Sequence, residues 1–449
     1  MAAGGSTKRR RRRRSFLKAA GAAATLGGLA GILAARWAPA FSQGTVLHVV
    51  RWTDFIPEAD IELRARQIPE AEKALGARIM LETVHPTDVL PRFVAAIRSG
   101  SGPDVFHLYY NWPHLYRKAL ADVSDVAAGI ADAQGGYYDV FKSSLRVGGA
   151  WLGVPHSVVG VAIAYRKSWF EEVGYSEFPR TWDELREATA ALKKKGRPYG
   201  QTLSHTFGDS DTWVYPLLWA FGGVETDSSG ERVMLASTET VASVKYMQAL
   251  WKEGCEESGL SWDETRNNRA FHAGEICATL NGTSIYISAK RQPDRVLDER
   301  GGPLYLDIGH AIYPLSGAAG QYPLYFSSGH GVMKYSSNRK LAGDFLRWLH
   351  RPENYRRWLE ASGGYSVAAT TQWEQDPMWS GFDRPLQLLR RAARNARIFG
   401  YRGPPSGNAT ETHSKYIIVD MYAKAVQGMP AEDAVGWAQG QLKTIYSRR

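Results

Sequence analysis

Short apolar runs alternate with amphipathic stretches along most of the chain. Residues 45–52, 78–84 and 104–108 are mainly apolar and rich in β-branched side chains, so they predict buried strands. Between the second and the third of these runs, residues 87–100 place their apolar side chains at helical spacing. A strand–helix–strand series of this kind predicts an α/β fold with a largely parallel sheet.

A second series of the same kind begins at Trp151. Residues 153–166 are apolar and predict extended chain, and Thr181 to Glu184 form the capping box of a helix that stops at Gly196. Farther along, the pattern predicts strands at 276–280 and 308–314 and helices at 212–221, 238–253, 341–349, 386–398, 415–427 and 430–446.

The formal charge of +10 belongs to the start of the chain. Nine of the 55 Lys and Arg residues lie in residues 1–40, which contain no acid, so the remainder holds 46 basic against 45 acidic side chains. This nearly neutral body has no basic surface typical of nucleic-acid binding, and we expect no nucleic-acid partner.

The first 40 residues have the three parts of an export signal. A basic start is followed by an apolar stretch at 19–35 and by Ala38-Pro39-Ala40, which predicts cleavage after Ala40. The run from Arg13 to Lys18 resembles a twin-arginine signal. We therefore expect a soluble periplasmic protein. Retention of the segment as a signal anchor remains the alternative, although the stretch is near the lower length limit for a membrane span.

The length of 449 residues predicts two or three domains, and the 44% of apolar residues are enough to give each a core. The two cysteines, Cys255 and Cys277, could form a disulfide in an oxidising compartment or remain two buried thiols. They lack metal-ligand spacing and the histidines are scattered, so we expect neither a metal site nor a cofactor.

The stretch from Trp151 to Lys194 resembles the family 1 extracellular solute-binding proteins, which include maltose-binding protein. Three motifs carry the resemblance: Leu152-Gly153-Val154-Pro155, Ala164 to Phe170, and Pro179 to Leu185. Residues 97–105, 220–237, 271–282 and 336–365 fit the family in the same order. Arg166, where the family usually has Asn, is a departure. So is the opening Trp52 to Pro57, which is close to that of polyamine-binding proteins.

The resemblance implies a two-lobed periplasmic-binding-protein fold, each lobe a mostly parallel sheet flanked by helices, with two or three hinge crossings. On this basis residues 45–155 and 308–350 are expected in lobe 1, and 156–307 and 351–449 in lobe 2. The expected crossings lie near 153–160, near 307–314 and near Tyr365. The resemblance also implies a small-molecule ligand, the transmembrane permease subunits of an ABC importer as partners, and a monomer.

Ligands of open α/β sheets bind beyond the carboxyl ends of the strands, which indicates the candidate contacts. Trp213 is added because it opens a predicted helix after a polar loop. The predicted ligand-binding residues are Trp52, Asp54, Tyr109, Tyr110, Asn111, Trp112, Trp213, Asn281, Thr283, Tyr286, Ser328, His330, Gly364 and Tyr365.

Aromatic rings next to short polar side chains suit the apolar faces and the hydroxyl rim of a sugar. A polyamine would need carboxylates facing its ammonium groups, and the sequence offers few: Asp54, Asp104, Asp209 and Asp211. A carbohydrate is therefore the favoured ligand and a cationic solute the alternative. The usual local signatures of hydrolases, zinc proteases and phosphate-binding loops are absent from the sequence. An exported glycoside-acting enzyme with two distant carboxylates is the remaining catalytic alternative.

Overall fold

The computed structural model describes residues 45–314 and 323–448. Leu47–Leu75 and Ile79–Arg449 form one compact unit. A second unit consists of Met1–Val46 with Gly76–Arg78. In its described part, the Arg78 N–H donates to the Thr45 carbonyl over 3.1 Å. The predicted twin-arginine signal and the cleavage site after Ala40 lie outside the described residues.

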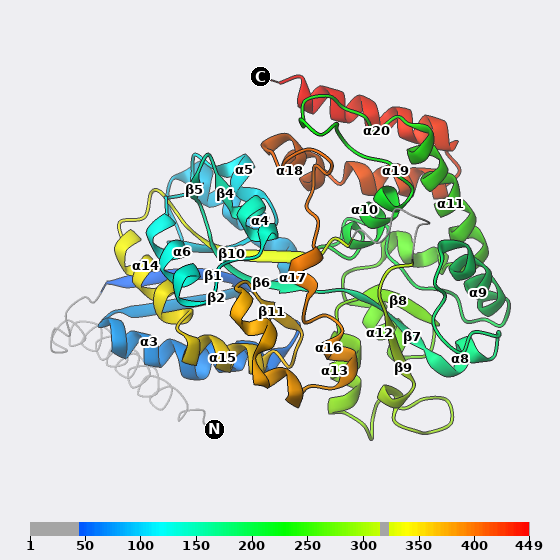
Figure 1. The fold of residues 1–449 in the computed structure, drawn as a ribbon, viewed down its shortest axis with the longest axis horizontal. Helices are drawn as coiled ribbons and strands as arrows, with labels where there is room; N and C mark the ends of the chain where they lie inside the picture. The colour runs from blue at the N-terminus through cyan, green and yellow to red at the C-terminus, as the bar shows by residue number, and fades with distance from the viewer. Residues whose placement is uncertain (1–44, 315–322, 449) are drawn as a thin grey trace, which may run out of the picture. The chain divides into compact units, whose positions relative to one another are not determined.

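A six-stranded sheet forms the centre of lobe 1, in the order β11-β6-β10-β3-β1-β2 (Figure 1). β1 and β3 are parallel, whereas β10 runs antiparallel to both of its neighbours, β3 and β6. The strands of this sheet are β1 (Val46–Trp52), β2 (Arg78–Val84), β3 (Val105–Tyr109), β6 (Val154–Val159), β10 (Phe326–Val332) and β11 (Ser366–Ala368).

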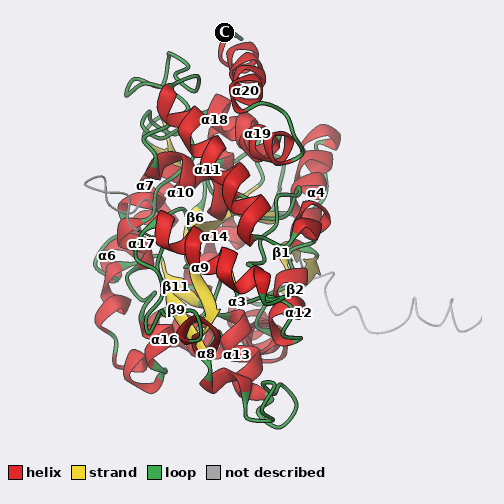
Figure 2. Cartoon of the chain, turned by 90° about the vertical axis from the view of Figure 1, so that its right-hand side faces the viewer, coloured by secondary structure: helices red, strands yellow, loops and turns green. Residues whose placement is uncertain are grey.

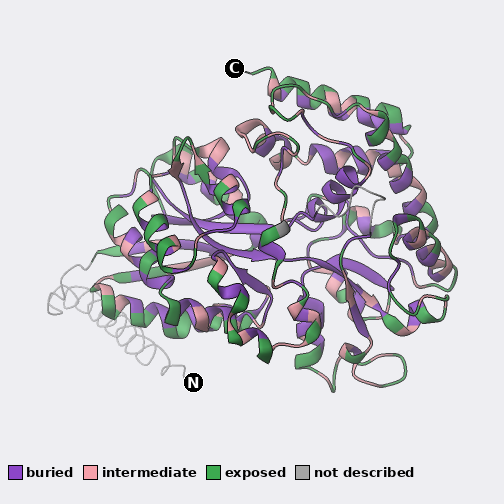
Figure 3. Ribbon diagram, viewed as in Figure 1, coloured by how far each residue is buried: buried purple, intermediate pink, exposed green. Residues whose placement is uncertain are grey.

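Lobe 2 is built on a three-stranded sheet in the order β8-β7-β9, and both pairings are antiparallel. Its strands are β7 (Ala162–Arg166), β8 (Ala278–Asn281) and β9 (Ile308–Ala311). A separate hairpin pairs β4 (Arg146–Val147) with β5 (Ala150–Trp151). β3, β6, β8 and β10 are buried along their whole length, whereas the edge strand β2 is mostly half-buried or exposed, and the helices turn their exposed sides outward (Figure 3).

Helices surround the strands of both sheets (Figure 2). In the first part of the chain they are α2 (Pro57–Ile61), α3 (Ile68–Leu75), α4 (Pro86–Ser99), α5 (Trp112–Tyr116), α6 (Ser124–Ala133), α7 (Asp139–Leu145), α8 (Lys167–Glu171), α9 (Trp182–Lys194), α10 (Asp211–Ala220), α11 (Thr238–Gly254), α12 (Arg266–His272) and α13 (Ser284–Arg291). A π-helical segment, η2 (Glu62–Gln67), joins α2 to α3, and 3-10 turns lie at η3 (Glu257–Ser261), η4 (Leu304–Leu306), η6 (Thr371–Gln375) and η7 (Pro377–Gly381). The later helices are α14 (Arg339–Leu349), α15 (Pro352–Ala361), α16 (Arg384–Gln387), α17 (Ala392–Asn395), α18 (Gly407–Ser414), α19 (Ile417–Val426) and α20 (Ala431–Tyr446).

Local sequence signals set several of these helix ends. At α9 the predicted capping box is present: Thr181 Oγ1 accepts from the Glu184 N–H over 3.2 Å, and a Glu184 carboxylate oxygen accepts from the Thr181 N–H over 3.1 Å. Gly196 then adopts a φ of +76°, which favours glycine and ends the helix. The helix predicted at 386–398 is wrong, because the segment holds only the short helices α16 and α17.

Three stretches of chain cross between the lobes. The first joins β6 to β7 through Gly160, and the second joins β9 to β10. The third follows β11, and its residue Arg397 forms a parallel bridge with Leu324 of the second. At Gly160 a Cβ atom would meet the Leu389 and Ala392 side chains at 3.0 Å, so the first and third crossings pack directly on each other.

The two-lobed α/β fold is confirmed, but two details of it are corrected. Neither sheet is mostly parallel. The lobe 1 sheet is mixed, because β10 enters lobe 1 from lobe 2 and so runs opposite to β3, and the lobe 2 sheet is antiparallel. Three predicted boundaries also shift: β6 stays in the lobe 1 sheet to Val159, β9 pairs in the lobe 2 sheet, and α15 and β11 belong with lobe 1. The third crossing accordingly lies after Tyr365. Among the residues that the structure describes, none of the helices combines the length and apolar character needed to cross a bilayer.

Candidate functional site

A cavity of about 270 Å³ lies between the lobes. Lobe 1 lines it with Pro86, Thr87, Leu90 and Pro91 at the start of α4 and with Tyr110 and Trp112 after β3. Lobe 2 lines it with His205, Phe207, Gly208, Asp211, His413, Ser414 and Tyr416. The wall from lobe 1 therefore lies at the carboxyl end of a strand, where open α/β sheets bind ligands.

Two strained residues lie in this wall. Tyr110 has a φ of +47° and Tyr416 a φ of +55°, and among the described residues they are the two non-glycine positions with positive φ. That backbone region is unfavourable for residues with a Cβ atom, and it persists where the surroundings impose it, often at functional sites. At Tyr110 the turn is held by its N–H, which donates to the Ser327 carbonyl over 2.9 Å.

Aromatic rings form the back of the cavity. Phe207 from lobe 2 lies 5.6 Å from the ring of Trp52 and 4.7 Å from that of Tyr109, centroid to centroid. Its neighbour Gly208 has a φ of +88°, and a Cβ there would lie 1.6 Å from a ring atom of Phe326. Glycine is therefore required at 208 to let this loop pack against lobe 1.

Five of the residues that line the cavity have a buried polar side-chain atom without a hydrogen-bond partner. These atoms are the Tyr110 hydroxyl, Trp112 Nε1, Asp211 Oδ1, His413 Nδ1 and the Ser414 hydroxyl. A buried polar group without a partner is destabilising, and native proteins retain few of them. A polar ligand in the cavity is one source of partners for these five residues.

Four buried carboxylates lie at the lobe boundary. Asp211 accepts from His413 Nε2 over 3.0 Å, and Glu264 of lobe 2 pairs with His85 of lobe 1 over 3.0 Å. Asp209 accepts from Asn267 Nδ2 over 2.8 Å, and burial, followed by the charge of Glu264, raises its pKa well above the usual range. Burial likewise raises the pKa of Asp54 to about 7, although the Ile56 N–H and Arg51 oppose the shift.

The structure brings five of the predicted residues together. Tyr110 and Trp112 line the cavity, and Trp52 and Tyr109 pack behind Phe207. Asn111 is fully buried between them with both side-chain polar atoms unpartnered, while its carbonyl accepts from the Thr410 hydroxyl over 2.9 Å. The cluster joins lobe 1 to α18 through this bond.

Four other predicted residues lie near the lobe boundary but do not line the cavity. Burial, followed by the charges of Asp54 and Asp209, raises the pKa of Tyr365 well above its usual range. The Tyr365 ring lies 6.3 Å from that of Phe55, centroid to centroid. Asn281 donates to Asn268, and the buried Thr283 hydroxyl has no partner.

The remaining predicted residues are held elsewhere. Trp213 is fully buried in lobe 2 and stacks on Tyr199 with 5.2 Å between centroids. Tyr286 donates to Asp383 over 3.0 Å, and Ser328 lies 3.1 Å from Ser157 within the lobe 1 sheet. Gly364 packs against Phe382, and His330 lies inside lobe 1 among other histidines.

The sequence reasoning missed Phe207, His413, Ser414 and Tyr416. The polar and aromatic loop before α10 gave a usable signal, because Trp213 was proposed from that loop while Phe207, six residues earlier, is the one that reaches the cavity. Residues 413–416 carry no local signal of this kind, because they lie at the junction of α18 and α19 and look like part of a helical segment. They reach the cavity because α18 packs against α5.

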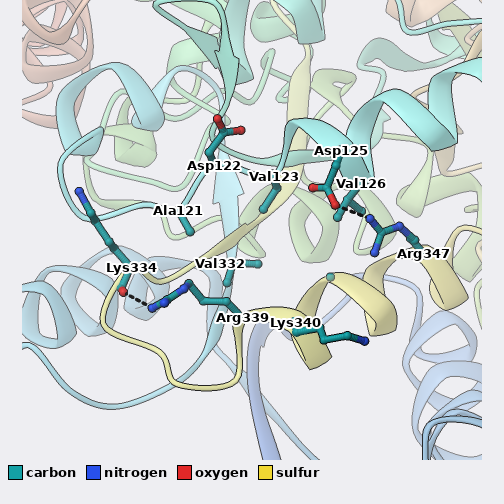
Figure 4. Close-up of a pocket in the computed structure, with 11 residues that line it drawn as sticks. Ala121, Asp122, Val123, Asp125, Val126, Val332, Lys334, Arg339, Lys340 and Arg347 are labelled. Carbon is teal, nitrogen blue, oxygen red and sulfur yellow. Dashed lines mark hydrogen bonds and ion pairs between the residues drawn. The ribbon is translucent and has the colours of Figure 1, made fainter.

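A larger hollow of about 710 Å³ lies on lobe 1 between α6 and α14 (Figure 4). Among its charged side chains, Arg347 pairs with Asp125, and Arg339 donates to the Lys334 main-chain carbonyl over 2.8 Å. It lacks the unpartnered buried atoms of the cavity between the lobes, so we assign the functional site to the smaller cavity.

The model of the family described as "Bacterial extracellular solute-binding protein" matches residues 65–356. A Deinococcus radiodurans protein named "Probable ABC transporter-binding protein" is 24% identical over 283 residues, which are 60% of this chain and 63% of that protein. The match thus spans less than two thirds of that relative.

Solved structures share the fold. Maltose-bound MalE3 of T. maritima aligns with a TM-score of 0.74 at 21% identity, covering 89% of this chain and 99% of that one. A solute-binding protein of Agrobacterium radiobacter K84 in complex with ribitol aligns with a TM-score of 0.72 at 18% identity, covering 89% of this chain and 98% of that one.

Proposed function

Since the chain belongs to the bacterial extracellular solute-binding protein family, we propose that it is the substrate-binding subunit of an ABC importer. It captures a carbohydrate in the cavity between its lobes and delivers it to the membrane permease. This role requires export to the periplasm and removal of the basic leader. The observation that carries the proposal is the set of five unpartnered buried polar atoms around an aromatic-walled cavity.

The chemistry of this wall suits hydroxyl groups. The Tyr110 and Ser414 hydroxyls can donate and accept, Trp112 Nε1 donates, and Asp211 Oδ1 accepts. The rings of Trp112 and Phe207 offer apolar surface to the C–H faces of a sugar. The ligands named for the two structural neighbours, maltose and ribitol, belong to the same chemical class.

The size of the cavity favours a small ligand. At about 270 Å³ it lies just below the range that usually holds a drug-sized molecule, roughly 300–1,000 Å³. A monosaccharide or a polyol is therefore favoured over a longer oligosaccharide.

A cationic solute such as a polyamine is the second candidate, and the buried carboxylates favour it. Asp54, Asp209, Asp211 and Glu264 are each 8% exposed or less, and ammonium groups would offset the cost of burying their charge. Their existing partners argue for the sugar, because His413 and His85 already pair with Asp211 and Glu264.

The test is isothermal titration calorimetry of the purified protein with monosaccharides, disaccharides, polyols and polyamines. We expect one group of sugars or polyols to bind, with an affinity that changes little between 50 and 500 mM salt. Polyamine affinity would instead fall as the salt concentration rises, because salt screens the attraction between the ammonium groups and the carboxylates while the ligand is still in solvent. Recovery of hydrolysed sugar after titration would support the glycoside-acting alternative.

Substitution of Asp211 by Asn links the ligand to this cavity. Asn keeps an oxygen acceptor but loses the charge, which lowers the worth of the hydrogen bond by about 1–1.5 kcal/mol, so affinity should fall roughly 5- to 10-fold. Asp132, an exposed acid on α6, supplies the matched control, Asp132→Asn, which should bind as the wild type does. Equal affinity of Asp211→Asn and wild type would move the site away from this cavity.

A further inference from the structure

A row of buried polar side chains crosses the sheet of lobe 1, apart from the cavity between the lobes. Arg51 lies on β1, His107 on β3, His330 on β10 and His156 on β6, and His350 follows α14. His330 pairs directly with His107 across the two strands. All five side chains are 2% exposed or less.

Three of these histidines are close enough to share one ion. A ring nitrogen from each of His156, His330 and His350 lies within 4.8 Å of the other two. The closest pair, His156 Nδ1 and His350 Nε2, is 3.2 Å apart, and the rings of His156 and His330 are 4.6 Å apart between centroids. Bonds of about 2.0–2.1 Å from each nitrogen to a central ion need only small side-chain movements.

The contacts around the cluster favour metal-ready imidazoles. His350 Nδ1 lies 2.8 Å from the Leu346 carbonyl, which can only accept, so Nδ1 carries the proton and the lone pair of Nε2 faces His156 Nδ1. Metal-bound histidines commonly donate their other N–H to a carbonyl in this way. His156 Nε2 and both ring nitrogens of His330 have no partner although they are buried.

Arg51 acts against a cation at this place. Burial lowers the pKa of all four imidazoles, and the positive charge of Arg51 lowers it further. The Arg51 guanidinium lies 5.6 Å from the ring centroid of Trp358. Ions that bind oxygen ligands gain little from imidazole and would be excluded. Only an ion with strong imidazole bonds can offset this repulsion, which points to the late first-row metals.

We propose that His156, His330 and His350 form a transition-metal site inside lobe 1, with Zn²⁺ as the expected ion. The site has three protein nitrogen ligands, and His107 stacks on His330 at its side with 5.1 Å between centroids. The ligands come from β6, β10 and the end of α14. β6 leads into the first crossing and β10 follows the second. The ion therefore joins the strands next to both crossings to the end of α14.

Zinc content and binding test the proposal on the full purified protein. After EDTA treatment and gel filtration, the protein is titrated with Zn²⁺, with Mg²⁺ as the comparison. We expect one equivalent of Zn²⁺ to be bound and retained, a rise in the melting temperature, and no effect of Mg²⁺. Co²⁺ in place of Zn²⁺ should give the intense visible absorption of a four-coordinate site. Failure of the wild-type protein to bind one equivalent of Zn²⁺ overturns the proposal.

Variants separate this cluster from the other histidines. His330→Leu is expected to weaken Zn²⁺ binding at least 100-fold, whereas His85→Leu, at an exposed histidine that pairs with the buried Glu264, should leave it unchanged. If His330→Leu does not fold by circular dichroism, His350→Gln carries the same test. Arg51→Gln should tighten binding at least tenfold, an effect that a metal-free polar cluster would not show. Retention of Zn²⁺ by the folded His330 or His350 variant would refute the assignment.

Discussion

Replacement of Asp54 by Asn tests whether the buried, ionised carboxylate after β1 lowers the free energy of unfolding. Asp54 is 5% exposed; its Oδ1 accepts from the Ile56 N–H over 2.9 Å, while Oδ2 has no partner. Asn keeps the acceptor at Oδ1 and removes the charge. We therefore expect Asp54→Asn to be more stable than the wild type at pH 8.

The magnitude follows from the pKa of Asp54, which burial raises from 3.8 to about 7. Arg51 and the Ile56 N–H lower it and Asp60 raises it, and all three are included in that value. One unit of pKa corresponds to 1.36 kcal/mol, so ionising the buried carboxylate lowers the free energy of unfolding by about 4 kcal/mol above pH 7.

The sign is fixed by proton linkage. The folded state holds this proton more tightly than the unfolded state, so the wild type loses stability as the pH rises from about 4 to about 7. Asp54→Asn lacks this loss. Its advantage over the wild type should grow by about 2–3 kcal/mol between pH 5 and pH 8.

Urea unfolding followed by tryptophan fluorescence at pH 5 and pH 8 measures this difference, with Asp132→Asn as the exposed control that should show none. Other buried acids with raised pKa values, such as Asp209 and Glu225, are common to all three proteins and cancel in the comparison. A variant less stable than the wild type at pH 8, or an advantage that does not change with pH, would refute the reasoning.

Three further substitutions test the framework. Asp307→Ala removes the acceptor that lies 2.8 Å from Nε of the buried Arg166, which keeps its pair with Glu299, and should lower the free energy of unfolding by about 1.5–3 kcal/mol; a loss below about 1 kcal/mol in urea unfolding would contradict this. Thr181→Ala removes the side-chain half of the capping box and should cost about 1 kcal/mol in the same measurement, whereas unchanged stability would mean that the cap contributes nothing. Gly160→Val forces a side chain against the third crossing and should lower the melting temperature through overpacking of about 1–3 kcal/mol, with calorimetry checking whether ligand affinity changes too.

Much of the fold could be predicted because the spacing of apolar residues and the capping residues of single segments indicate its strands and helices. β2 coincides with the predicted strand 78–84, and β1, β3 and α9 differ from prediction by a residue or two. The direction of β10 could not be predicted, because nothing in its sequence tells from which lobe the chain enters the sheet. The failure at 386–398 has a similar cause: its residues pack against Gly160 and the lobe 1 sheet, and this tertiary contact overrides a helical pattern.

The candidate site was predicted only where it follows a strand. Trp52 and Tyr109 end β1 and β3, Tyr110 and Trp112 follow β3, and the rule for strand ends finds them. His413 and Tyr416 reach the cavity through long-range packing of the C-terminal helices, which leaves no local pattern. The histidine cluster escaped for the same reason, since 194 positions separate His156 from His350.

The position of β10 between β3 and β6 has a consequence for synthesis of the chain. β3 and β6 leave the ribosome early, but the strand that must lie between them is complete only at Val332. Until then both strands expose unpaired backbone edges, which are templates for association with other chains. Lobe 1 therefore cannot finish folding during translation of its own first half. The nascent protein should depend on chaperones that shield extended segments, and fragments ending before residue 326 should aggregate rather than form an independent lobe.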